Sequence, residues 1–166
     1  MNRGLLAGAG LLVLLGCGGG GGPLELVSAE PPAGARPAGE RAERQGGADP
    51  DAGERIYDLR PREGSTLNYT VTVRNPTSEV VSVTGVAADD DRDGAFVPER
   101  IVNGPVQVQP GREADVIVEG TVRGCDYGSQ EVPLAGPELE VRSDGGTDTQ
   151  ELDLGIQVEI KVQGCA

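Results

Sequence analysis

Apolar and polar residues alternate through much of the chain after about residue 56. In residues 152–162 every second position is aliphatic, and residues 67–74 and 114–122 show the same period of two. This period predicts β-strands with one buried face, because successive side chains of a strand point to opposite faces. The core residues expected from the last strand are Leu152, Leu154, Ile156, Val158, Ile160 and Val162.

Turn-forming sequences separate the predicted strands. Residues 75–78 read Asn-Pro-Thr-Ser, residues 110–111 read Pro-Gly, and residues 143–146 read Ser-Asp-Gly-Gly. Short apolar stretches at 80–86 and 139–141 predict further strands. No helical period occurs after residue 16. We therefore expect an all-β chain that folds as an antiparallel β-sandwich of two sheets.

The N-terminal residues have a different pattern. Residues 5–15 are apolar and follow a short polar segment that contains Arg3. This run is too short to cross a bilayer, which takes roughly 20 residues, but it has the length of the apolar region of a signal peptide. We expect residues 1–16 to form a signal peptide, which implies export.

The signal ends in a short motif. Residues 14–17 read Leu-Leu-Gly-Cys, and they resemble the lipobox of bacterial lipoproteins. The resemblance implies that Cys17 carries a diacylglyceryl group, becomes the first residue of the mature chain, and anchors the protein to the cell membrane on its extracytoplasmic face. Leu15 is bulkier than the usual lipobox residue at that place. The alternative is an ordinary secretory signal with an incidental cysteine.

Glycine and proline dominate residues 17–53. Residues 18–22 are all glycine, and prolines and charged residues follow. Such a composition cannot bury much apolar surface, so we expect a flexible linker with an r.m.s. reach of roughly 30–35 Å. Residues 24–28 alternate weakly and are the exception, as a candidate edge strand. The β-sandwich domain is expected over residues 54–166.

Two cysteines remain after Cys17 is assigned to lipid. Cys125 and Cys165 form an even pair in a chain that is predicted to be exported, where disulfides persist. We expect them to form a disulfide bond; two free thiols are the alternative.

Several segments resemble bacterial immunoglobulin-like domains. They are residues 67–76 with the strand at 80–86, and Val108-Gln109-Pro110-Gly111 before a valine-rich strand. A cysteine after that strand, paired with a C-terminal cysteine, is also similar to uncharacterised actinobacterial secreted proteins. The resemblance implies an immunoglobulin-like β-sandwich, and these domains share no single activity.

Composition narrows the function. Asp and Glu number 27 against 14 Lys and Arg, a net charge of −13 that disfavours nucleic acid as a partner. The sequence has no His, and its one Met is residue 1, which excludes Ser–His and Cys–His nucleophile pairs and Met/His copper sites. We therefore expect no enzyme and no cofactor. The expected function is a non-enzymatic surface-tethered lipoprotein, a binding or structural module of the cell envelope, whose partner is an envelope protein or a polysaccharide.

One acidic motif supports an alternative function. Asp89, Asp91 and Asp93, followed by Gly94, occupy positions 1, 3, 5 and 6 of a calcium-binding loop. Position 12, where the bidentate Glu is needed, holds Arg100. The alternatives are thus a calcium-binding envelope module, with an acidic solvated loop as the simpler interpretation, and a carboxylate-dependent hydrolase. A partner would meet the interstrand loops, such as those at residues 89–97 or 124–137, or a sheet edge.

The disulfide between Cys125 and Cys165 is testable by mass spectrometry. A non-reduced digest of the exported protein should contain the two cysteine peptides joined together, and reduction should separate them. Complete alkylation of both thiols without a reductant would contradict the prediction.

Overall fold

The computed structural model describes residues 22–41, 54–87, 95–123, 132–134 and 136–163. Every regular element among these residues is a β-strand, and the strands form three sheets of four. The prediction of an all-β sandwich is therefore confirmed. Its strands pair mainly in the antiparallel sense, as expected.

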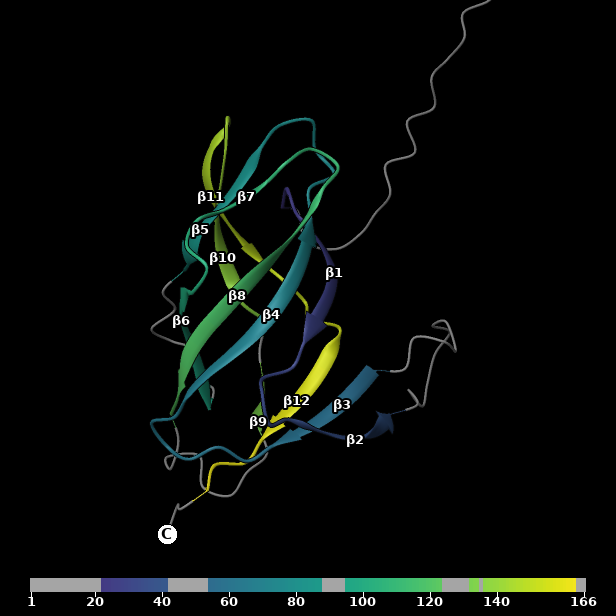
Figure 1. The fold of residues 1–166 in the computed structure, drawn as a ribbon, viewed down its shortest axis with the longest axis vertical. Coiled ribbons are helices and arrows are strands. Elements are labelled where there is room, and N and C mark those ends of the chain that lie inside the picture. Colours follow the sequence, from purple (N-terminus) through teal and green to yellow (C-terminus); the bar gives the residue numbers. More distant parts are fainter. Residues whose placement is uncertain (1–21, 42–53, 88–94, 124–131, 135, 164–166) are drawn as a thin grey trace, which may run out of the picture.

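The first sheet, which we call the long sheet, has the order β1-β4-β8-β6. Its strands are β1 (Glu25–Glu30), β4 (Thr66–Arg74), β8 (Glu113–Val122) and β6 (Phe96–Ile101), and all their pairings are antiparallel. Strands β4 and β8 pair from Thr66↔Thr121 to Arg74↔Glu113 without a register shift. This pair is the continuous middle of the sheet (Figure 1).

The second sheet, the hairpin sheet, has the order β11-β10-β5-β7. Its strands are β11 (Gly146–Glu151), β10 (Glu138–Ser143), β5 (Val81–Val86) and β7 (Val106–Val108), again antiparallel throughout. The turn predicted at residues 143–146 joins β10 to β11, with Ser143 opposite Gly146.

The third sheet, the mixed sheet, has the order β2-β3-β12-β9. Its strands are β2 (Arg36–Arg41), β3 (Glu54–Leu59), β12 (Ile156–Ile160) and β9 (Val132–Pro133). Strands β3 and β12 run parallel, so the purely antiparallel, two-sheet arrangement was wrong at this place. The alternation in β12 specifies which face is buried, but it says nothing about the direction of its neighbours.

The three sheets share one hydrophobic core. The alternating residues of β4 and β8 point inward, and Val71 and Val116 lie directly opposite each other with no exposed surface. Val83 of the hairpin sheet and Val158 of the mixed sheet are equally buried and belong to the same cluster. Figure 1 shows the hairpin sheet and the mixed sheet at opposite ends of the long axis.

Few aromatic residues contribute to this core. Tyr69 and Phe96 meet edge to face, with ring centroids 5.9 Å apart. Gly120 makes room for this pair, because a Cβ there would overlap the Phe96 ring and the backbone of Val97. The remaining core is made mostly of Val, Leu and Ile.

The last predicted strand is shorter than expected, but its buried face is as predicted. All six residues from Leu152 to Val162 that were assigned to the core are at most 9% exposed. Gly155, at φ +60°, interrupts the extended backbone before β12 begins at Ile156. Asp153 is exposed, whereas Gln157 and Glu159 are half-buried because β12 lies between β3 and β9.

The linker expected over residues 17–53 is not all linker. Residues 24–28, the candidate edge strand, fall mostly within β1, which pairs with β4 at the edge of the long sheet. Residues 36–41 form β2 and pair with β3. The Pro37 position is tolerated because β2 is itself an edge strand. Composition alone suggested a flexible chain, but sheet edges offer backbone partners to such segments.

Asn75 is a buried polar residue at the predicted turn after β4. It has no exposed surface, and its side-chain amide donates to the carbonyls of Glu79 (2.7 Å) and Val108 (2.8 Å). Its Oδ1 accepts from the backbone N–H (2.9 Å) and the hydroxyl (2.7 Å) of Thr77. One side chain therefore joins the β4–β5 turn to the end of β7.

Truncation of β12 tests its register. Ile156→Ala should lower the free energy of unfolding by about 2–4 kcal/mol, because it leaves a cavity in the core. Gln157→Ala, on the other face, should cost no more than about 0.5 kcal/mol. Denaturant unfolding of both variants gives the comparison, and equal losses would contradict the assigned faces.

Replacement of Asn75 tests the buried amide. Asn75→Asp should destabilise the fold by about 3 kcal/mol or more, because it removes both donors to Glu79 and Val108 and places a carboxylate in a dry site. Thr77→Ala removes one of the four hydrogen bonds of the Asn75 side chain, together with two longer, exposed ones between the Thr77 hydroxyl and the Glu79 backbone, and should cost about 1 kcal/mol. Thermal or denaturant melts measure both; a neutral Asn75→Asp would contradict the role given to the amide.

Candidate functional site

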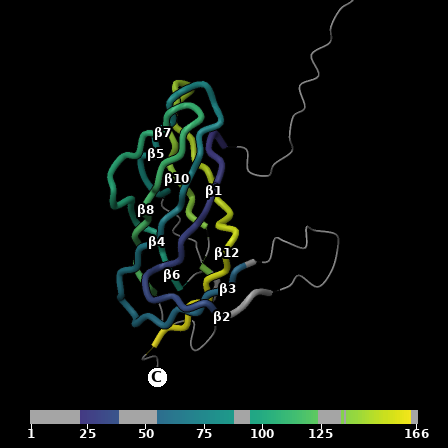
Figure 2. The backbone as a smooth tube through the Cα atoms, turned by 45° about the vertical axis from the view of Figure 1, so that its right-hand side comes forward, coloured from purple at the N-terminus to yellow at the C-terminus, as the bar shows by residue number. Residues whose placement is uncertain are grey.

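A cleft of about 650 Å³ lies at the mixed-sheet end of the domain. Gly34 and Arg36 line it from the β1–β2 connection and the start of β2, and Asp58, Leu59 and Arg60 line it from the end of β3. Its volume lies in the range of small-molecule sites in proteins. Figure 2 shows the β1–β2 and β3–β4 connections running close together at this end.

Backbone hydrogen bonds fix the rim of the cleft. Gln163, beyond β12, donates its N–H to the carbonyl of Pro61 (2.7 Å), and Ser65 donates to the carbonyl of Arg62 (3.1 Å). Gly34, at φ +91°, closes the β1–β2 turn, in which Ala35 donates to Pro32 (3.0 Å). Pro61, Ser65 and Gln163 thereby become parts of one wall.

The wall combines apolar and polar surface. Leu59 is 4% exposed, and Leu67 is half-buried beside it. The hydroxyl of Ser65 and the amide of Gln163 supply neutral donors and acceptors. An apolar base with a few polar groups at the rim is typical of a ligand site.

The charged groups of the cleft come from two arginines and one aspartate. Arg36 of β2 lies directly opposite Asp58 of β3, which lies opposite Glu159 of β12. Among the described residues, the guanidinium groups of Arg36 and Arg60 make no ion pair or hydrogen bond. The charged side chains among the described residues that line the cleft sum to +1 (Arg36, Arg60 and Asp58), in a chain of net charge −13.

The predicted site residues lie elsewhere. Cys17, Cys125, Cys165, Asp89, Asp91 and Asp93 all fall outside the described residues. The expected disulfide and the expected calcium loop therefore stay predictions. Within the described ranges, no group of three or more Cys, Asp or Glu residues could hold a metal ion.

Sequence analysis missed the cleft. It assigned ligand contact to loops such as residues 89–97 and 124–137, or to a sheet edge without naming residues, and none of the described residues that line the cleft comes from those two loops. One signal was available, since Arg36, Arg55, Arg60 and Arg62 lie close together in the sequence of an acidic protein. Only the pairing of β3 with β12 and β2 brings Arg36, Arg60 and Gln163 to one place.

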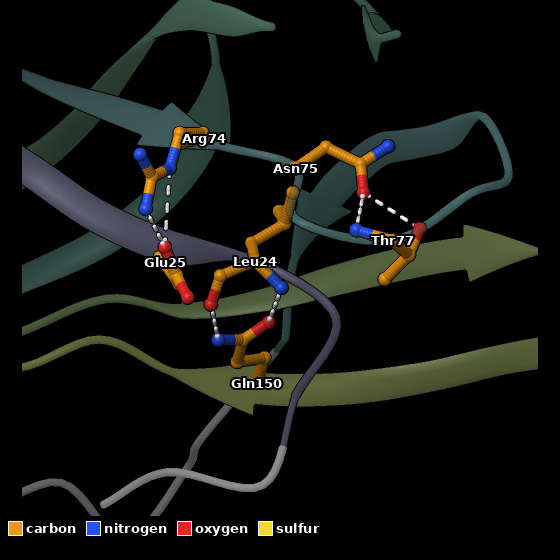
Figure 3. Close-up of polar contacts among 6 residues, drawn as sticks. All are labelled: Leu24, Glu25, Arg74, Asn75, Thr77 and Gln150. Carbon is orange, nitrogen blue, oxygen red and sulfur yellow. Dashed lines mark hydrogen bonds and ion pairs between the residues drawn. The ribbon is translucent and has the colours of Figure 1, made fainter. Parts of the chain in front are cut away.

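A second structural feature lies at the other end of the domain, where the chain enters β1. The Gln150 side chain accepts from the Leu24 N–H (3.0 Å) and donates to the Leu24 carbonyl (2.6 Å), as Figure 3 shows. Gln150 is 6% exposed. Gly22 is needed beside it, because a Cβ there would overlap the Gln150 side chain. At least one glycine of the 18–22 run is therefore required for close packing.

An ion pair adds to this attachment. Arg74 of β4 donates from Nε (3.1 Å) and Nη2 (2.5 Å) to Oε2 of Glu25, the residue opposite it in β1. The hydrogen bond to Glu25 raises the pKa of the Arg74 guanidinium above its ordinary value. Both side chains are half-exposed, so the pair stabilises β1 only modestly. Gln150 and Glu25 together fix the start of β1 to two sheets.

No described segment forms a helix long and apolar enough to cross a bilayer. A comparison with protein-family models and a search of curated proteins found no match.

The chain is similar to several solved structures, among them two proteases of Vibrio cholerae. One is the VesB protease of Vibrio cholerae, with 13% identity and a TM-score of 0.36 over 66% of this chain. The other is the secreted serine protease VesC of Vibrio cholerae, with 11% identity and a TM-score of 0.31 over 63% of this chain. The match covers 31% of the VesB chain and 21% of the VesC chain.

This finding corrects two expectations. The first expectation was that the chain is a non-enzymatic binding or structural module. The second was that it is not an enzyme. These two solved structures are proteases, so neither expectation is kept. TM-scores below 0.5 assign no reaction to this chain either, and its 166 residues contain no His from which to build a Ser–His pair. We therefore propose neither a non-enzymatic module nor a protease.

Proposed function

We propose that this chain is an exported lipoprotein, held on the extracytoplasmic face of the cell membrane by lipid on Cys17. The support is the sequence of the first 17 residues, with a short apolar run that ends in Leu-Leu-Gly-Cys. Acyl chains on one cysteine suffice for stable anchoring, since each buried CH₂ contributes about 0.8 kcal/mol. An immunoglobulin-like origin of the sandwich, suggested by residues 67–76 and 80–86, is part of the same proposal.

The attachment of Leu24 limits how far the folded domain can lie from the proposed anchor. Gln150 fixes Leu24 to the hairpin sheet, so only residues 18–23 separate the proposed anchor from the folded domain. Whatever their conformation, these residues span at most about 25 Å. The domain would then stay close to the bilayer, and the reach of roughly 30–35 Å expected from a linker to residue 53 is not needed.

A short tether also sets which end of the domain is near the membrane. Pro23 lines the same hollow as Ser143 and Gly145 of the β10–β11 turn. The cleft of Arg36 and Arg60 lies at the opposite end, with the mixed sheet (Figure 1). In this proposal the β10–β11 end faces the bilayer and the cleft opens toward the cell envelope. The net charge of −13 discourages the domain from lying on anionic lipid.

Replacement of the lipid-bearing cysteine tests the anchor. Cys17→Ser should move the protein from the carbonate-washed membrane fraction to the soluble fraction, and mass spectrometry of the wild-type N-terminal peptide should show the added acyl mass. The double variant Cys125→Ser/Cys165→Ser is the control and should stay with the membrane. A Cys17→Ser protein that still pellets with washed membranes would refute the anchor.

A further inference from the structure

We propose that the cleft between the β1–β2 and β3–β4 connections binds a hydroxylated carboxylate, namely a uronic acid unit of an acidic polysaccharide. This inference rests on the described residues at the cleft and not on the lipid anchor. Either proposal can therefore fail without the other.

The two guanidinium groups give the cleft its preference for an anion. A guanidinium presents a planar fork of N–H donors that matches both oxygens of a carboxylate. Arg36 and Arg60 line the same cleft from different segments, and within the described ranges neither guanidinium is engaged by another side chain. Their donors are thus available to a ligand, in a chain whose overall charge would otherwise repel it.

The rest of the wall favours a sugar acid over a small inorganic anion. Asp58, opposite Arg36 in the β2–β3 pairing, lines the same cleft, so the cleft also holds a carboxylate that accepts hydrogen bonds from hydroxyl groups and repels a dianion such as phosphate more strongly than a singly charged carboxylate. Ser65 and Gln163 offer further partners for hydroxyls, and Leu59 supplies an apolar surface for ring carbons. The volume of about 650 Å³ is far larger than a bare anion needs.

The geometry of the wall is preorganised. Pro61 is buried, and its carbonyl accepts a backbone hydrogen bond of 2.7 Å from Gln163. Arg62 and Gln163 form an isolated parallel β-bridge through their backbones. Lys161 donates its N–H to the carbonyl of Leu59 (2.9 Å). A ligand therefore meets a wall whose backbone is already ordered, which lowers the entropic cost of binding.

Calorimetric titration of the purified full chain with trigalacturonic acid tests the proposal. Binding should be measurable and should weaken with added salt, because it depends on a charge pair that is partly exposed. Arg36→Gln and Arg60→Gln should each weaken it about tenfold or more, since each removes a charged hydrogen-bond donor. The control is Arg142→Gln, an exposed arginine of β10 at the far end of the domain, which should leave the affinity unchanged.

Two comparison ligands identify the chemistry that is recognised. Galactotriose, which lacks the carboxylates, should bind at least tenfold more weakly than trigalacturonic acid. Inorganic phosphate should not displace trigalacturonic acid at a similar concentration. Absence of trigalacturonic acid binding, equal binding of galactotriose, displacement by phosphate, or an equal loss in Arg142→Gln would each overturn the proposal. Matching thermal melts of the variants show that a loss of binding does not reflect unfolding.

Discussion

The antiparallel pairing of β4 with β8 is the constraint on which the other strands depend. Nine consecutive residue pairs hold their inward aliphatic side chains in one plane, and both the hairpin sheet and the mixed sheet contribute to the core that these side chains begin. Strand β1 attaches to β4, and β6 attaches to β8. A slip of one residue in this pair would turn Val71 and Val73 toward water.

The mixed sheet brings together the residues that line the cleft. Strand β12 brings residues near the C-terminal end of the chain beside β3, in the parallel sense, and β2 completes the other side of β3. Parallel neighbours place their ends together, so the segments that leave β3 and β12 meet at one edge and form the wall of the cleft. The charged residues Arg36, Asp58 and Glu159 then form a single row across three strands.

The comparison with solved structures concerns whether an activity can be assigned to the chain, whereas the residue content concerns which nucleophiles the chain can form. The likeness to two Vibrio cholerae proteases, with TM-scores of 0.36 and 0.31, assigns no activity to this chain, so the expectation of a non-enzymatic chain is withdrawn and no reaction replaces it. The absence of His from the sequence limits which nucleophile chemistry its own residues could perform. Recognition of a ligand at the cleft is compatible with both facts, because it depends on Arg36 and Arg60 and not on a nucleophile.

The sequence by itself determined which residues are buried in its regular strands. Alternation specified the inward faces of β4, β8 and the segment from Leu152 to Val162, because side-chain direction in a strand has a period of two and water rejects the aliphatic face. The turn at Asn75 was also readable, since Asn and Pro favour it. Local composition, however, gave a wrong prediction for residues 22–41, where glycine and proline suggested a flexible linker and the structure has β1 and β2.

Only the tertiary structure decided how those strands pair and what their ends bring together. The amide of Gln150 fixes Leu24 to the hairpin sheet, although 126 positions separate them in sequence. Arg36, Arg60 and Gln163 line one cleft because β3 pairs with strands that come before and after it in the chain. Alternation fixes the face of a strand but not its neighbour, since every exposed strand edge offers the same backbone donors and acceptors.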